Sequence, residues 1–502
     1  MSITSPESGA AGGQTAAVPP PGCPAHAAYA DTGLVKLYDA RAQSDPSGLY
    51  EKLRVEYGSV APVELEGGVS AWLVLGYREN TEAARNPARF TRDSRIWREW
   101  QEGRIGADHP MAPILAWRPD CTSLDGEEHQ RLRAAVNDCL AKFDRHGIRR
   151  HVQRYANQLI DAFIETGRAD LVGQFAEQLP MLVFMRLIGL DEEAGAQLIE
   201  ANNGLVKGGE KAVEYNEFII RTLSELVAAR RKTPAYDLAS WFAQHPSGLS
   251  DEEVVGHLRV VQVLGAETTT NLVSSTLRMV LTDPRFRASL TGGLMTLPDA
   301  VEQMLWDEPP LAVCPARFAT HDMEFGGKQI KEGDLLVLGF AAGNTDPEMR
   351  PDLDAPMHGN RSHLAFSRGP HECPGQEISR AITDTGVDVL LSRLPDLQLA
   401  VAEQELSWTA STWSRKLDAL PVRFAAQRRP APQPEEPRQP AVPRTVPQAA
   451  PVGAAPVAPQ TPGLSAAAAA VAAIAEADAA AAAQERNRRG FWGSLFGVFR
   501  GR

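Results

Sequence analysis

Cysteine is scarce in this chain: five residues among 502, namely Cys23, Cys121, Cys139, Cys314 and Cys373. Their odd number and scattered positions argue against a disulfide framework and favour the reducing cytoplasm. No apolar run reaches the roughly 18 residues of a membrane-spanning helix, and the first residues lack the charged-then-apolar pattern of a secretory signal. We therefore expect neither a membrane span nor a secretory signal.

An excess of positive charge is also missing, because 51 Lys and Arg stand against 63 Asp and Glu. The net charge of −12 gives no electrostatic reason to expect nucleic acid as a partner. With 43% hydrophobic residues the chain is long enough to bury a large core. These properties fit a soluble enzyme or a large soluble binding protein.

Composition divides the chain into five parts. Residues 1–29 are rich in Ser, Gly, Ala and Pro and predict a disordered tail, and residues 30–426 have the composition of one folded domain. Residues 427–463 form a proline-rich spacer. Residues 464–485 are mainly alanine and predict a helix, which Glu476 and Asp478 disqualify as a membrane span. Residues 486–502 are basic and aromatic.

Helical periodicity dominates the presumed domain, from about residue 127 to 287, with breaks near Gly167, Gly189 and Pro246. Residues 60–77 predict a β-hairpin that turns at Gly67 and Gly68. Further strands are expected at residues 323–330 and 335–340. The fold class is therefore mostly α with minor β sheets.

One predicted helix is unusually long. Ser250 and Glu253 form a capping box, and the apolar pattern then continues to about Leu281, a helix of about thirty residues and about 48 Å. Its middle contains the sequence L-G-A-E-T-T-T, residues 264–270. Threonine hydroxyls can bond backbone carbonyls and open a helical turn there. Taken alone, this segment is either a polar patch facing solvent or a functional groove.

Residues 366–375, F-S-R-G-P-H-E-C-P-G, place Cys373 on a loop that leads into a helix with a buried face. The free N–H groups and the positive end of that helix favour a thiolate and moderate its electron donation to a metal. An axial haem ligand has these properties. The alternative for a single cysteine is a buried structural thiol.

The loop resembles the haem-binding loop of cytochrome P-450 monooxygenases, usually F-G-x-G-x-H-x-C-x-G. The matching residues are Phe366, Gly369, His371, Cys373 and Gly375, and Ser367 replaces the first glycine. The resemblance covers approximately residues 30 to 425. It implies the cytochrome P-450 fold with disordered extensions at both ends, and haem b whose iron is axially ligated by Cys373.

The segment 264–270 resembles the oxygen-binding groove of the P-450 central helix, A-G-x-[D/E]-T-T, with Leu264 in place of the alanine. The resemblance implies that Gly265 lies beside the cofactor. It also implies that Glu267 and Thr268 form the acid and alcohol pair that delivers protons during oxygen activation.

Haem carries two propionates that need cationic partners when they are buried. His129 and Arg133 lie one helical turn apart and resemble the family's H-x-x-x-R helix. Arg317 and His363 match two further propionate partners. Each of the four could be an ordinary surface charge by itself, but together they occur in the family's order around the cysteine.

One departure concerns the Glu-x-x-Arg motif that P-450 sequences carry before a Glu-Pro-Pro segment. Here Gln303 and Trp306 occupy its two positions, and E-Q-M-L-W, residues 302–306, resembles an unusual actinobacterial subgroup. The usual third partner is an arginine in the loop before the cysteine, for which Arg361 and His358 are candidates. A buried ionic network can be replaced as a unit by neutral hydrogen-bonding groups, so we expect a compensated structure.

The resemblance implies a monooxygenase that inserts one oxygen atom from O₂ into an apolar small molecule. Its electrons would come from a separate ferredoxin and ferredoxin reductase, since no flavin or iron–sulfur segment is fused. Residues 95–117 and 201–211 are the candidates for the substrate pocket. The rival hypothesis is a non-catalytic haem protein, a sensor or regulatory subunit, which the lost Glu-x-x-Arg and the appended tail favour.

The C-terminal segment 486–502 has an apolar stripe if it is helical, made of Phe491, Trp492, Leu495, Phe496 and Phe499 and flanked by arginines. Because a long spacer precedes it, the stripe has no core of its own to join. It predicts either an anchor on anionic lipid at the inner membrane surface or a docking peptide for a protein partner. A third interpretation is a cargo tag, because Gly-Ser-Leu near a basic C-terminus resembles encapsulin-loading peptides.

Overall fold

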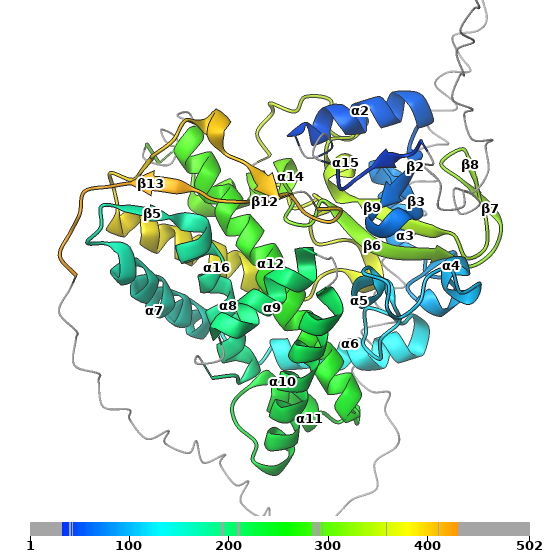
Figure 1. The fold of residues 1–502 in the computed structure, drawn as a ribbon, viewed down its shortest axis with the longest axis horizontal. Helices are drawn as coiled ribbons and strands as arrows, with labels where there is room; N and C mark the ends of the chain where they lie inside the picture. The colour runs from blue at the N-terminus through cyan, green and yellow to red at the C-terminus, as the bar shows by residue number, and fades with distance from the viewer. Residues whose placement is uncertain are drawn as a thin grey trace, which may run out of the picture. The chain divides into compact units, whose positions relative to one another are not determined.

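The computed structural model describes residues 33–429, except 40–41, 43, 192–194, 208–210, 284–285, 287–291, 294, 358 and 410, and except the side chains of 206–207. The chain divides into two compact units, Met1–Ala431 and Pro432–Arg502. All that follows concerns the described part of the first unit (Figure 1). The predicted N-terminal tail, the alanine-rich helix and the aromatic segment 486–502 lie outside the described residues.

Helices make up most of the described fold, as the sequence predicts (Figure 1). The longer ones are α2 (Pro46–Tyr57), α3 (Tyr77–Arg85), α6 (Gly126–Leu140), α7 (Arg145–Phe163), α8 (Gln178–Ile188), α9 (Gly195–Lys207), α10 (Ala212–Lys232), α12 (Asp251–Thr282), α14 (Leu297–Asp307) and α16 (Gln376–Arg393). Short helices are α4 (Arg98–Gln101), α5 (Ala112–Leu115), α11 (Leu238–Ala243) and α15 (Phe340–Asn344), and a π-helical segment covers Val172–Ala176.

The long central helix is confirmed as α12, with 32 residues. Its predicted capping box is present, because the Ser250 hydroxyl accepts from the Glu253 N–H while the Glu253 carboxylate accepts from the Ser250 N–H. This satisfies two of the N–H groups that a helix start leaves unpaired. The helix remains α-helical through residues 264–270, so its threonines do not break it.

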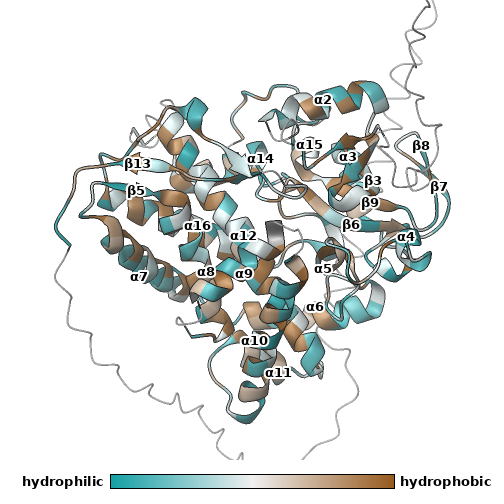
Figure 2. Ribbon diagram, viewed as in Figure 1, coloured by the Kyte–Doolittle hydropathy of each residue, from teal (hydrophilic) through white to brown (hydrophobic). Residues whose placement is uncertain are grey.

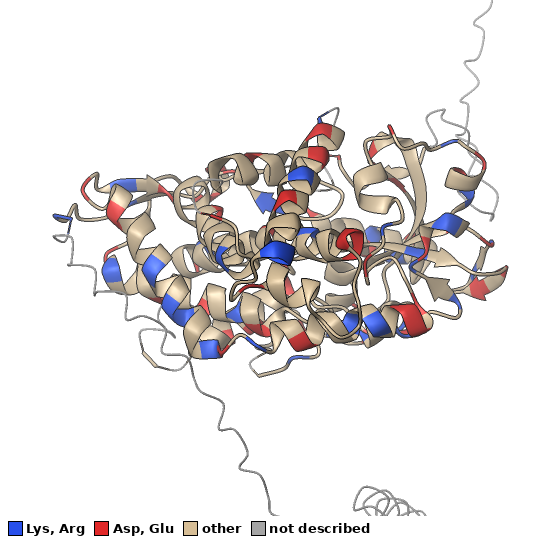
Figure 3. Ribbon diagram, turned by 90° about the horizontal axis from the view of Figure 1, so that it is seen from below, with Lys and Arg blue, Asp and Glu red and all other residues tan. Residues whose placement is uncertain are grey.

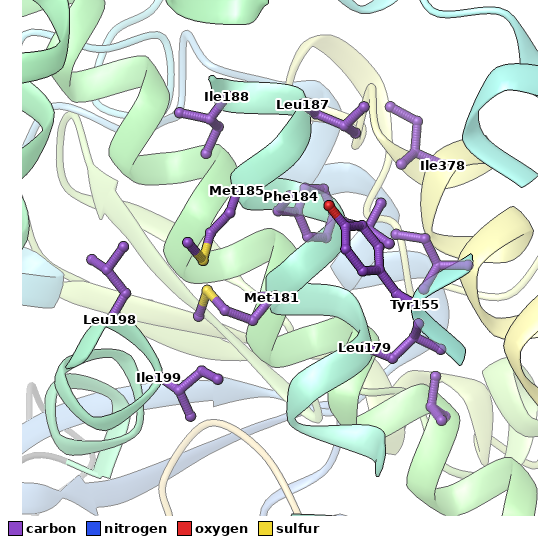
Figure 4. Packing of buried hydrophobic residues seen from close by; sticks show 14 of the residues in the cluster. Tyr155, Leu179, Met181, Phe184, Met185, Leu187, Ile188, Leu198, Ile199 and Ile378 are labelled. Carbon is purple, nitrogen blue, oxygen red and sulfur yellow. The ribbon is translucent and has the colours of Figure 1, made fainter. Parts of the chain in front are cut away.

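Apolar packing around α12 holds the helices together. Figure 4 shows Met181 and Met185 of α8 pointing toward Leu198 and Ile199 of α9. The main core cluster also contains residues of α7, α10 and α16, and α12 packs against α8, α10 and α16. Burial of this kind stabilises a fold by about 25 cal/mol per Å² of apolar surface, and here it fixes α12 beside α16, the helix that follows the cysteine loop.

A sheet forms the second layer, in the order β1–β2–β3–β9–β6–β4. Its strands are β1 (Val35–Lys36), β2 (Val60–Leu65), β3 (Val69–Val74), β4 (Phe90–Thr91), β6 (Val313–Ala319) and β9 (Leu335–Gly339). β2 and β3 pair antiparallel from Val60↔Val74 to Leu65↔Val69, and β3 pairs parallel with β9. β9 is buried at every position and apolar throughout (Figure 2).

Smaller sheets complete the fold. They are β7 (Met323–Phe325) with β8 (Lys328–Ile330), β11 (Trp408–Thr409) with β12 (Lys416–Leu417), and β5 (Arg168–Asp170) with β13 (Pro421–Arg423) and β10 (Gln398–Leu399). The predicted hairpin at residues 60–77 is confirmed, and Gly67 and Gly68 have the positive φ of 77° and 78° that its turn needs. The predicted strands at 323–330 and 335–340 are also confirmed, whereas β5 and β6 were not predicted.

Charged residues of both signs are interspersed along the helices in the view of Figure 3. Among the described residues, no helix combines the length and the apolar character that crossing a membrane requires. The described cysteines Cys121, Cys139, Cys314 and Cys373 all carry free thiols.

Candidate functional site

The cysteine loop ends directly before α16, as predicted. Gly375 is the N-cap of α16, and Cys373 lies two residues before it. The Cys373 N–H donates to the Phe366 carbonyl over 2.8 Å, which closes the loop on itself. The residue Cys373 is half-buried. Burial of its thiol raises the pKa of Cys373, and the Gly375 N–H and two nearby arginines oppose that rise. The thiol therefore ionises most readily when a metal cation binds it.

Two backbone positions shape this loop. Gly369 has φ 72°, and a Cβ there would lie 2.9 Å from the Ala84 carbonyl oxygen, so only glycine fits. Ser367, which replaces the family's glycine, also has a left-handed backbone, with φ 61°. It is the one described non-glycine residue with positive φ, and its buried hydroxyl has no hydrogen-bond partner. The loop thus keeps the glycine conformation without the glycine.

Cationic side chains gather beside the cysteine loop. The rings of His129, on α6, and His371 lie 4.3 Å apart between centroids. Arg317, on β6, is 2% exposed and forms no ion pair with any described carboxylate; its guanidinium donates to the Ala316 carbonyl over 3.1 Å. Arg133 donates to the Glu372 carbonyl, which ties α6 to the same loop.

Burial and the crowding of basic side chains make positive charge unfavourable in this cluster. Burial, followed by the charges of Arg317 and Arg92, lowers the pKa of His371 to about 3. Burial and the nearby Arg92 likewise lower the pKa of Arg317 to about 9. The pKa of His129 is lowered by burial and by Arg133, and its buried Nε2 has no hydrogen-bond partner. A dianionic group would relieve this unfavourable crowding.

Sequence reasoning missed two residues of the cluster, Asp125 and Arg92. His371 Nε2 lies 2.9 Å from Asp125 Oδ1, while the Thr91 hydroxyl and the Arg92 N–H donate to Asp125 Oδ2. Burial opposes ionisation, but these hydrogen bonds outweigh it and lower the pKa of Asp125 to about 2. Asp125 therefore fixes the ring of His371. Its place four residues before His129 is the sequence signal that could have identified it.

These residues fit haem. The buried Arg317, which has no carboxylate partner among the described residues, and the neighbouring Arg133, His129 and His371 suit its propionates, and a thiol at a helix N-terminus suits its iron. His129, Arg133, Arg317, His371 and Cys373 thus meet in one place, as the family resemblance implies.

His363 is the predicted propionate partner that the structure does not bring to this cluster. Its ring is 2% exposed and its Nε2 lies 3.1 Å from Glu302 Oε2. The Trp306 ring stands perpendicular to it at 6.0 Å, and the Phe366 ring is 5.7 Å away. His363 therefore connects α14 to the cysteine loop. Its buried Nδ1 has no hydrogen-bond partner among the described residues, so its role toward a propionate stays a prediction.

The middle of α12 has one open side. Leu264 is 45% exposed although most of α12 is buried, and the Thr268 hydroxyl donates to the Leu264 carbonyl over 2.7 Å. The interaction expected of this threonine is therefore present. Gly265 faces α8, because a Cβ there would lie 3.0 Å from the Phe184 ring. Helix packing accounts for this glycine.

Glu267, the residue before Thr268, is buried. It is 6% exposed, and its carboxylate lies 3.9 Å from the ammonium of Lys416, which Glu177 binds more closely at 2.8 Å. Burial raises the pKa of Glu267, while Lys416 lowers it and Glu177 raises it. Glu267 is thus a buried acid that holds its proton more tightly than an exposed glutamate does.

The replaced Glu-x-x-Arg pair is compensated. Gln303 accepts from the Met357 N–H over 2.9 Å and donates to Asp307 over 2.9 Å. The indole N–H of Trp306 donates to the Asn360 carbonyl over 2.7 Å. Neutral side chains on α14 therefore hold the backbone at Met357 and at Asn360. Of the two candidate third partners, His358 lies outside the described residues, and Arg361 pairs with Glu302 at 3.6 Å and Glu377 at 3.1 Å.

The predicted substrate-pocket segments are described in part. In residues 95–117 the Arg95 guanidinium lies over the Trp117 ring at 4.8 Å, and the buried indole N–H of Trp117 has no partner. Residues 201–211 include the end of α9, and positions 208–210 lie outside the described residues.

Comparison with known proteins gives a consistent result, although no family model matches the chain. The chain is 30% identical over 392 residues to 2-hydroxy-5-methyl-1-naphthoate 7-hydroxylase of Streptomyces carzinostaticus, covering 76% of this chain and 95% of that protein. It is 30% identical over 390 residues to mycinamicin IV hydroxylase/epoxidase of Micromonospora griseorubida, covering 75% and 95%.

Solved structures agree. The myxobacterial cytochrome P-450 CYP267B1 in complex with myristic acid superimposes with a TM-score of 0.71 at 26% identity, covering 78% of this chain and 99% of that one. CYP154A1 from Streptomyces coelicolor gives 0.68 at 27% identity, covering 76% and 98%. The haem-compatible cluster, the cysteine loop and these relatives lead to one conclusion: the chain belongs to the cytochrome P-450 family of haem-thiolate monooxygenases.

Proposed function

We propose that the protein inserts one oxygen atom from O₂ into an apolar small molecule. The observation that carries this proposal is the meeting of the thiol of Cys373, just before α16, with the buried Arg317, which has no carboxylate partner among the described residues, and with Arg133, His129 and His371. The names of the relatives, a 2-hydroxy-5-methyl-1-naphthoate 7-hydroxylase and a mycinamicin IV hydroxylase/epoxidase, support oxygen insertion into a small molecule. Haem, when bound, supplies the activation of O₂.

The residues of the chain then have distinct roles. Cys373 is the proposed iron ligand, and the Cys373 N–H bond to Phe366 keeps the sulfur in place. His129, Arg133, Arg317 and His371 are the proposed propionate partners, and His363 is a further one through its buried, unpartnered Nδ1. Gly369 and Gly375 allow the loop to pass close to α3 and to the sulfur.

The proposed reaction also needs a supply of protons. Glu267 is the proposed acid, because its pKa is raised by burial and its carboxylate lies near Lys416 and, through it, Glu177. Thr268 is the proposed alcohol, because it is half-buried beside the exposed Leu264. Its hydroxyl donates to the Leu264 carbonyl and can exchange this acceptor for another one. Glu267 would hold the proton, and Thr268 would orient its delivery.

Electrons are proposed to come from a separate ferredoxin and ferredoxin reductase, and the location is proposed to be cytoplasmic. The four free thiols of the described region are those that a reducing compartment preserves. We also assign the chain to the actinobacterial subgroup with Glu-Gln-x-Leu-Trp, because Gln303 and Trp306 bond to the loop as a neutral pair.

Product analysis under ¹⁸O₂ tests this proposal. Ligands are first screened for the change in haem spin state that substrate binding causes, and each ligand found is incubated with ferredoxin, reductase and NAD(P)H. One labelled oxygen in the product is the expected result. Haem that binds ligands but yields no labelled product with any competent redox partner would support the rival function, a haem-binding sensor or regulatory subunit, which the lost Glu-x-x-Arg favours.

A further inference from the structure

Glu302, the residue before Gln303 on α14, is the centre of a buried ionic cluster. It is 5% exposed, and its carboxylate receives the fork of Arg380 on α16, with Nε at 2.6 Å from Oε1 and Nη2 at 3.2 Å from Oε2. His363 Nε2 lies 3.1 Å from Oε2 on the same carboxylate. Bidentate pairs of this geometry are among the strongest hydrogen-bonded contacts in proteins. One carboxylate therefore ties α14 to α16 and to the loop before Cys373.

The cluster continues to the cysteine. The guanidinium carbon of Arg380 lies 4.7 Å from the centre of the Phe366 ring, and the carbonyl of Phe366 accepts the Cys373 N–H over 2.8 Å. The His363 ring also lies against the Phe366 ring, with 5.7 Å between the ring centres. Only two contacts thus separate the Glu302 carboxylate from the backbone that sets the position of Cys373.

The charge of Glu302 supports the same connection between α14 and the cysteine loop. Burial opposes ionisation of Glu302, but hydrogen bonds from His363 and Arg380 outweigh it and lower the pKa to about 2, so the group is an anion. Arg380 is 3% exposed, and its other acceptors are the side chains of Gln376 and Glu377. Without Glu302, a buried cation would lose its closest counter-ion.

Among the described residues, the side-chain hydrogen bonds of Gln303 and Trp306 go to Asp307 and to the backbone of Met357 and Asn360, several residues before the cysteine loop. The Trp306 ring meets the His363 ring edge-on at 6.0 Å, but neither Gln303 nor Trp306 brings a charge to the loop. We propose that Glu302 is the positioning residue of the cysteine loop, carrying through Arg380 and Phe366 the ionic connection that the altered motif no longer provides. This inference rests on the proposed role of Cys373 as the iron ligand.

The test compares Glu302→Gln with Glu377→Gln in the haem-loaded protein. Glu377 is a matched control, because it also lies near Arg380 and Arg361 but is half exposed and does not touch His363. Three properties are measured: the Soret band of the reduced carbon monoxide complex, the rate of haem transfer to a scavenger protein, and amide hydrogen exchange in residues 363–373.

For Glu302→Gln we expect a large share of the complex to lose the strongly red-shifted band, haem transfer at least about tenfold faster, and faster exchange in the loop, while Glu377→Gln behaves like the parent. Glu302→Gln behaving like the parent overturns the inference. If Glu302→Gln yields no folded protein, Arg380→Lys, which keeps the charge but loses the fork, is judged by the same three measurements. A parent without the red-shifted band would instead contradict the proposed function itself.

Discussion

At the scale of single residues, Ser367 is the clearest departure from the conformation its side chain prefers. A non-glycine residue with φ 61° costs about 1–2 kcal/mol, and the buried hydroxyl is without a partner. Ser367→Gly removes both penalties but gives the unfolded chain more freedom, so we expect a net gain of about 1 kcal/mol in the free energy of unfolding.

Denaturant unfolding of the parent, Ser367→Gly and Ser367→Ala measures this gain. The alanine variant removes the hydroxyl but keeps the unfavourable backbone, so it should remain less stable than the glycine variant. Equal stability of the two variants would show that the backbone conformation carries no cost.

Thr268 offers a functional test at the same scale. Thr268→Ala should retain haem and substrate binding but divert electrons from NAD(P)H to peroxide, because the hydroxyl that now bonds to Leu264 is lost. Product formed per NAD(P)H consumed is the measurement, and Thr268→Ser, which keeps the hydroxyl, is the control. Unchanged coupling in the alanine variant would exclude Thr268 from proton delivery.

The site shows which residues a sequence can predict. Cys373, His371 and Thr268 belong to short motifs, so their neighbours in the sequence identify them. Asp125 was missed because its contact with His371 joins positions 246 residues apart. For His363 the motif fixes the place in the chain but not the direction of the ring, so the contact of its Nε2 with Glu302 was not predicted.

At the scale of elements, α12 and the hairpin β2–β3 were predictable because a capping box and two turn glycines mark their ends. β6 was not predicted, since its Pro315 and the irregular pairing between Cys314 and Arg317 interrupt the strand pattern. β6 forms a strand because it pairs with β9 and β4, and neither of them adjoins it in the sequence. Pairing of this kind is set by the tertiary structure.

Helix α14 carries a prediction about the altered motif. Gln303→Glu should lower the free energy of unfolding by about 3 kcal/mol, because it replaces the amide that donates to Asp307 with a buried like charge. The new acid would have a folded pKa above its unfolded value of about 4.3. Its penalty is therefore absent at low pH and grows as the pH rises through that value.

Thermal melting of Gln303→Glu and of Gln303→Glu with Trp306→Arg, from acidic to neutral pH, checks this. The double variant should recover only part of the loss, since the loop backbone of Met357 and Asn360 already matches the neutral pair. A higher melting temperature for the single variant at neutral pH would show that α14 still favours the family's acid.

At the scale of the whole molecule, we predict that the segment 486–502 acts separately from the haem domain, because a proline-rich spacer of residues 427–463 precedes it. Removing residues 486–502 should leave the haem spectrum and thermal stability unchanged. Association should be lost instead, with anionic vesicles or with a protein partner.

Vesicle flotation and pull-down of the full-length and truncated proteins, each at low and high salt, distinguish these partners. High salt should release the protein from anionic lipid, since it screens arginine attraction, but should affect aromatic burial in a protein groove much less. Identical behaviour of both proteins in every condition would remove docking as the function of this segment.

The central claim is that Cys373 ligates haem iron in a cytochrome P-450 active site. The reduced protein under carbon monoxide measures it most directly, because the position of the Soret band reports the axial ligand. The parent should show the strongly red-shifted band of a thiolate-ligated haem, and Cys373→Ala should lack it. A parent that binds no haem, or a red-shifted band that survives Cys373→Ala, would contradict the account.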